Sequence, residues 1–131
     1  MIDFGPELVG RTEKSLGALL RRTLADTGLT EQQYITLKVA SALGGADELI
    51  ESVRARAHFA DAEQLAAALT ERALLNEGRL SAAGATVLDQ ILRAMAGQTA
   101  TIWTGLPDDE VAATTRVLNA VLARAESVLS T

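Results

Sequence analysis

The chain has 131 residues, a length that one domain with its own hydrophobic core can account for. Hydrophobic residues make up 48% of the chain and charged residues 22%, a balance that excludes disordered and low-complexity proteins. The lack of cysteine excludes disulfides, thiol nucleophiles and cysteine-based metal sites, while a formal net charge of −5 has the wrong sign for simple attraction to nucleic-acid phosphate.

The spacing of apolar residues predicts two helices in the first third of the chain. Leucines on one helical face indicate the first helix over Glu7–Asp26. Thr30 and Gln33 then match a capping box, in which each side chain bonds the backbone of the other residue. We predict a second helix from this box to about Leu43, ended by the glycine pair Gly44–Gly45.

The middle of the chain reads as two short helices with a break between them. We predict the first over Asp47–Ala57 and the second from Asp61 to about Leu75, because Asp61 and Gln64 repeat the capping-box spacing. The break at 58–60 is tight, so this pair is typical of a helix-turn-helix unit.

Two long helices are predicted to complete the chain. Ser81 is the expected N-cap of a helix that runs to about Trp103, and Pro107 with the acids after it starts a helix that runs to Leu129. The gap Asn76–Leu80 is too short for two strands and a tip. We therefore predict an all-α fold of six helices with little or no β-structure.

Three segments, in this order, resemble the MarR family (multiple antibiotic resistance regulators). Gly28–Leu37 is similar to the entry of that family's second helix, and Gly105–Leu129 to its closing helix. Arg79–Leu92 resembles the passage from the wing to the long dimer helix, with Leu80-Ser81-Ala82-Ala83-Gly84 in place of the usual Leu-Thr-x-x-Gly. The chain is most similar to acidic, alanine-rich members typical of actinobacteria, with a shortened wing.

The resemblance implies one winged helix-turn-helix domain over residues 1–131 that forms a homodimer. Helices 7–27, 81–104 and 107–129 would build the dimer, and residues 30–80 would hold the helix-turn-helix. The expected interface residues are Leu8, Leu16, Leu20, Leu118, Val121 and Leu122. The apolar faces of the terminal helices favour the same arrangement, because a small monomer would expose them. A single-chain helical bundle is the alternative.

The candidate DNA-binding residues lie in and around the two short helices. They are Gln64, Arg54, Arg56, Arg72 and Arg79. Gln64 could read adenine or cap its own helix, and the arginines could hold phosphates, pair with nearby acids or mark a solvated face. Residues 44–84 contain four arginines but seven acidic residues, so we expect DNA binding to be weak, salt-sensitive or absent.

A small aromatic ligand is expected where the family's dimer helices meet its DNA-binding lobe. Tyr34, Leu37 and Trp103 are assigned to that site, with packing in the core or dimer as the alternative for the two aromatic residues. Neither the single histidine, His58, nor the acids 108–110 complete a catalytic or metal-binding constellation, so no enzyme activity and no cofactor are expected.

The function predicted from the sequence is transcriptional regulation by a MarR-like homodimer that binds DNA and responds to a ligand. The alternative is a MarR-fold dimer that has lost DNA binding and binds small molecules or proteins. We find neither a basic start followed by an apolar run nor an apolar stretch that reaches ~18 residues, so the expected location is cytoplasmic, with no membrane partner.

Overall fold

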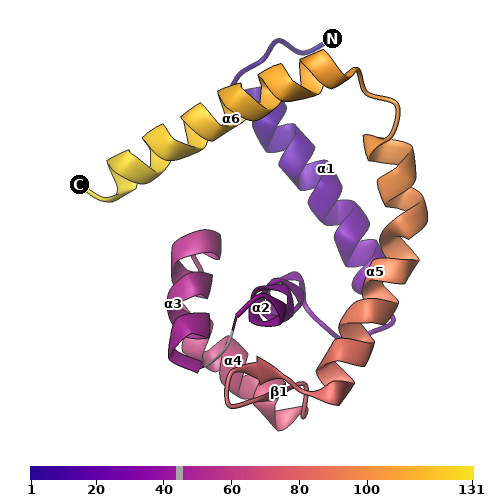
Figure 1. Cartoon of the computed structure of the whole chain (residues 1–131), viewed down its shortest axis with the longest axis vertical. Helices are drawn as coiled ribbons and strands as arrows, with labels where there is room; N and C mark the ends of the chain where they lie inside the picture. The colour runs from indigo at the N-terminus through magenta and orange to yellow at the C-terminus, as the bar shows by residue number, and fades with distance from the viewer. Residues whose placement is uncertain (44–45) are drawn as a thin grey trace. The chain divides into compact units, whose positions relative to one another are not determined.

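The computed structural model describes residues 1–43 and 46–131, and these are mostly helical (Figure 1). The elements are α1 (Pro6–Leu24), α2 (Glu31–Ser41), α3 (Ala46–Ala57), α4 (Ala62–Glu71), β1 (Leu75–Asn76), β2 (Arg79–Leu80), α5 (Ala82–Trp103) and α6 (Asp108–Leu129). The chain forms two compact units, Met1–Ala96 and Gly97–Thr131, with their boundary inside α5. The helix stop predicted at Gly44–Gly45 lies outside the described residues.

The turn between α1 and α2 is fixed by local hydrogen bonds. Helix α1 ends at Leu24, before the predicted Asp26, because the Thr27 amide and hydroxyl both donate to the Leu24 carbonyl, at 2.9 and 2.7 Å. The capping box at the start of α2 is confirmed. The Gln33 amide donates to Thr30 Oγ1, and the Thr30 amide donates to Gln33 Oε1, each at 3.1 Å.

Helix α4 begins where predicted but lacks the predicted side-chain cap, and it ends earlier than predicted. The expected capping role of Asp61 is wrong, since its backbone is not extended (φ −96°, ψ 29°) and its side chain makes no capping bond. The helix ends at Glu71 and not at Leu75, because Ala73 takes a left-handed conformation (φ 61°). The amides of Ala73 and Leu74 then bond the Thr70 and Leu69 carbonyls, the two bonds of a Schellman motif.

The early end of α4 leaves room for a minimal β-hairpin. Leu75 pairs with Leu80 and Asn76 with Arg79 in antiparallel register. Both residues of the connecting turn have positive φ, 55° at Glu77 and 78° at Gly78, as a type I′ hairpin turn requires. The expectation that this segment is too short for two strands and a tip is therefore wrong. The prediction of six helices and little β-structure is confirmed for the described residues.

The core of the first unit lies among α2, α3 and α4, which contact one another in pairs. Leu37, Leu49 and Leu69 contribute one fully buried leucine from each of these helices. Thr36 is buried too, and its hydroxyl donates to the Gln32 carbonyl at 2.8 Å. The other buried core residues that the structure describes are aliphatic, except for Tyr34.

The second unit contains the end of α5 and all of α6. No residue of α6 is buried. Its exposed large apolar residues are Val111, Val117, Leu118, Val121, Leu122, Val128 and Leu129. Among the described residues, no helix combines the length and the apolar character that crossing a membrane requires.

Candidate functional site

Ser81 and Gly84 join the hairpin to α5. The Ser81 hydroxyl donates to the Ala73 carbonyl at 2.6 Å and accepts from the Gly84 amide at 2.9 Å, which confirms its role as N-cap of α5. The Ser81 amide donates to the Leu74 carbonyl at 3.1 Å. A Cβ atom at Gly84 would collide with that same carbonyl. The serine and glycine of the Leu-Ser-Ala-Ala-Gly segment thus hold the end of α4 against the start of α5.

Arg54 and Arg72 both bond other parts of the chain. Arg54 Nη2 lies 3.0 Å from Glu63 Oε1, an ion pair that links α3 to α4. Arg72 Nη1 donates to the Gly28 carbonyl at 3.1 Å, and Nη2 to the Thr27 carbonyl at 3.3 Å. Arg72 therefore forms an ion pair with neither Glu71 nor Glu77, the acids nearest to it in the sequence. It ties the end of α4 to the α1–α2 turn.

The other three candidate DNA contacts are exposed. Gln64 on α4, Arg56 on α3 and Arg79 on β2 have no side-chain hydrogen bond or ion pair among the described residues. Gln64 does not cap its own helix, the alternative role considered for it, since no side chain caps the start of α4. These three side chains are free to contact an outside partner.

The three proposed ligand-binding residues have different environments. Tyr34 is 3% exposed, and burial raises the pKa of its hydroxyl above the ordinary value of 10.0. Its ring lies under the Lys38 ammonium, 5.7 Å from the ring centroid. Leu37 is fully buried in the same core, while Trp103 is 57% exposed and belongs to the second unit.

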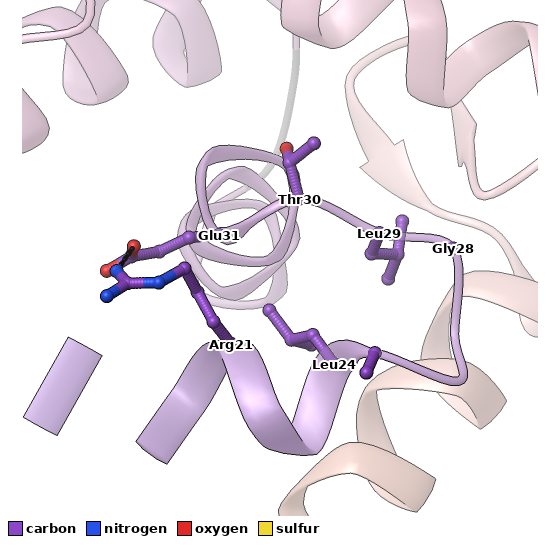
Figure 2. Close-up of a pocket in the computed structure, with 7 residues that line it drawn as sticks. Arg21, Leu24, Gly28, Leu29, Thr30 and Glu31 are labelled. Carbon is purple, nitrogen blue, oxygen red and sulfur yellow. Dashed lines mark hydrogen bonds and ion pairs between the residues drawn. The ribbon is translucent and has the colours of Figure 1, made fainter. Parts of the chain in front are cut away.

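The α1–α2 turn holds a pocket of about 300 Å³ that is open to solvent. Its lining residues are Arg21, Leu24, Ala25, Gly28, Leu29, Thr30 and Glu31. Figure 2 shows Arg21 reaching from α1 to Glu31 at the start of α2, with Leu24 and Leu29 nearby. None of the proposed ligand residues lines this pocket. Gly28 and Thr30 indicate a turn in the sequence, but they do not predict a pocket there.

The proposed dimer residues divide between two levels of exposure. Leu8, Leu16 and Leu20 on α1 are half-buried. Leu118, Val121 and Leu122 on α6 are exposed. Each set gives an apolar helix face that solvent reaches.

No cluster of three or more potential metal ligands exists among the described residues. The acids 108–110 form the first turn of α6, where the positive end of the helix stabilises negative charge. The chain matches no family model, no curated protein and no solved structure.

Proposed function

We propose that this protein is a MarR-like transcriptional regulator that binds DNA as a homodimer and responds to a small ligand. The observation that carries the proposal is the order of elements around Ser81. A helix pair, α3 and α4, is followed by a two-stranded hairpin and then by the long helix α5. The hairpin–helix junction is built by Ser81 and Gly84, which belong to one of the three segments that resemble the family.

The apolar face of α6 supports the homodimer. A helix of 22 residues with no buried residue leaves a continuous apolar stripe in water, which single soluble chains rarely do. Two-fold pairing lets the same stripe on two copies cover itself. The half-buried leucines of α1 are a second apolar surface that we assign to the dimer.

Exposed residues of α3, α4 and the hairpin support a limited DNA contact. Gln64 has an amide that suits adenine in the major groove, and Arg56 and Arg79 can each reach a phosphate. With so few phosphate contacts in each subunit, the counterion-release contribution to affinity is small. We expect weak binding that falls quickly as salt rises.

A second candidate function is a MarR-fold dimer that does not bind DNA. The arginine contacts favour it, because Arg54 and Arg72 bond Glu63 and the α1–α2 turn. Phosphate contact by either residue would first break those bonds. An acidic excess over residues 44–84 would also repel the duplex.

A salt titration with the DNA upstream of the protein's own gene tests both candidates. For a DNA-binding dimer, log K should fall linearly with log salt, and Arg79→Ala or Arg56→Ala should reduce the slope by about 1 per lost contact in each subunit. Arg93→Ala is the matched control, since Arg93 pairs with Asp89 on α5 at 2.8 Å. An absence of binding at low salt would favour the second candidate.

A further inference from the structure

The Arg72 guanidinium lies between the ends of two helices. Arg72 is the C-cap of α4, and the carbonyls that it bonds belong to Thr27 and Gly28, in the turn that follows α1. The carbonyl end of a helix carries partial negative charge, which a nearby cation stabilises. Two bonds from one planar guanidinium also fix its orientation. The Arg72 side chain is exposed, but it is already bonded within the chain.

The α1–α2 turn gives Arg72 a firm point of attachment. The Thr27 hydroxyl donates to the Leu24 carbonyl at 2.7 Å and accepts from the Leu29 amide at 3.1 Å. Leu24 and Leu29 are 2% and 6% exposed, so both ends of this bonded segment are anchored in the core of the first unit. The bonds of Arg72 therefore join the end of α4 to a part of the chain that does not move independently of the core.

Packing holds the earlier turns of α4 more closely than its last turn. The buried residues of this helix are Ala62, Leu65 and Leu69, and no side chain caps its start. Thr70 and Glu71, which follow Leu69 to the end of the helix, are exposed. The bonds of Arg72 thus add a polar attachment where the buried face of α4 ends. They constrain the direction of the helix, and not only the face that it packs.

We propose that Arg72 is a positioning residue for base recognition by Gln64. The two residues lie at opposite ends of α4, and the exposed Gln64 is next to the buried Leu65. A glutamine reads adenine through two hydrogen bonds, which weaken steeply when they are misaligned. Arg72 holds α4 in the direction that aligns the Gln64 amide, and it makes no phosphate contact itself. This inference rests on the DNA binding proposed above.

Salt titrations with two DNA duplexes test the proposal. One duplex is the DNA upstream of the protein's own gene, and the other is a shuffled sequence of equal length and base composition. The preference is the ratio of the two association constants. Gln64→Ala should lower the preference by about tenfold, because a bidentate base contact is lost. Arg72→Ala should lower it by a similar factor and leave the slope of log K against log salt unchanged.

A double variant shows whether Arg72 acts through Gln64. If it does, Gln64→Ala has almost no further effect on the preference once Arg72 is replaced by alanine. Arg72→Lys should recover only part of the preference, because an ammonium does not reproduce the planar fork. Arg93→Ala is the matched control, since this exposed arginine pairs with Asp89 on α5, and it should change neither preference nor slope. Partial unfolding weakens binding to both duplexes by the same factor, so the preference is insensitive to it.

Several results would overturn the proposal. A slope reduced by about 1 in each subunit of Arg72→Ala would identify a phosphate contact. An unchanged preference in Arg72→Ala, or losses that add in the double variant, would show that Arg72 does not act through Gln64. Equal binding of both duplexes by the parent chain would show that Gln64 reads no base. If the parent chain binds neither duplex at low salt, the proposed DNA binding fails together with this inference, whereas each of the other results refutes the inference alone.

Discussion

Arg72 and Gly28 lie 44 residues apart in the chain, and a hydrogen bond of 3.1 Å joins them. The donor stands at the C-cap of α4, and the acceptor is the carbonyl of a turn residue with a φ of 72°. A second bond to the Thr27 carbonyl makes the guanidinium a bridge between the end of α4 and the α1–α2 turn. Because Gly28 also lines the turn pocket, this bridge connects the pocket to α4.

Replacing Arg72 by alanine should therefore destabilise the fold. Loss of two charged hydrogen bonds at an exposed site should lower the free energy of unfolding by about 1–2 kcal/mol. Arg72→Lys should recover only part of this, because an ammonium does not reproduce the planar fork. Arg56→Ala is the control and should change stability by less than about 0.5 kcal/mol. Urea denaturation measures all three variants, and equal stability of Arg72→Ala and Arg56→Ala would contradict the bridge.

Gly84 should not tolerate even one additional methyl group. A Cβ atom there collides with the Leu74 carbonyl and approaches Leu80 Cδ2 to 3.2 Å, so Gly84→Ala should cost about 3 kcal/mol. The same substitution at Gly97 meets nothing within 4 Å and should stabilise α5 by about 1 kcal/mol. Thermal unfolding of the two variants should give shifts of opposite sign. If Gly84→Ala leaves the thermal stability unchanged, the hairpin–helix junction can widen without a cost in stability, which would contradict this prediction.

Ala73 offers a stabilising substitution. Its left-handed conformation at the end of α4 is unfavourable for any residue with a Cβ, so Ala73→Gly should stabilise the protein by about 1 kcal/mol. The matched control is Ala67→Gly inside α4, which should destabilise by about 1 kcal/mol because glycine is a poor helix former. Urea midpoints that move in the same direction for both variants would argue against strain at Ala73.

Signals between near neighbours in the chain predicted the local structure well. The Thr30–Gln33 box and the Ser81 cap were placed correctly, because each needs only residues three apart and an extended backbone at the cap. Asp61 and Gln64 have the same spacing, but the Asp61 backbone is not extended, and the spacing alone does not reveal this. The hairpin was missed because Ala73, a good helix former, ends α4 early and releases Leu75 to pair with Leu80.

Contacts between distant residues were not predictable in the same way. The exposed side chain of Arg72 read as a phosphate contact or a partner for nearby acids, since nothing local points to carbonyls in another turn. The pocket arises where the end of α1 meets the start of α2, and Arg21 and Glu31 are ten residues apart. Tertiary packing determines both features, and local patterns in a single sequence do not show which distant residues come into contact.

Tyr34 should make the free energy of unfolding depend on pH in the alkaline range. Burial raises the pKa of its hydroxyl in the folded state above 10.0, so the folded chain holds this proton more tightly than the unfolded chain does. The contribution is complete below the unfolded pKa of about 10, and stability then falls as pH rises through the interval up to the folded pKa. Tyr34→Phe should remove this part of the alkaline loss. Urea denaturation between neutral and alkaline pH checks it, and identical pH profiles for the two proteins would contradict the argument.

The exposed stripe of α6 gives the last prediction, that Leu118→Glu breaks a dimer. A glutamate in the middle of a self-covering apolar face would be buried without a partner, which costs several kcal/mol. Ala123→Glu places the same charge five residues later, on the opposite side of the helix, and should leave the assembly intact. Sedimentation velocity at micromolar concentration should show a dimer for the parent chain and Ala123→Glu, and a monomer or unfolded chain for Leu118→Glu. If the parent chain sediments as a stable monomer, the proposed homodimer is wrong.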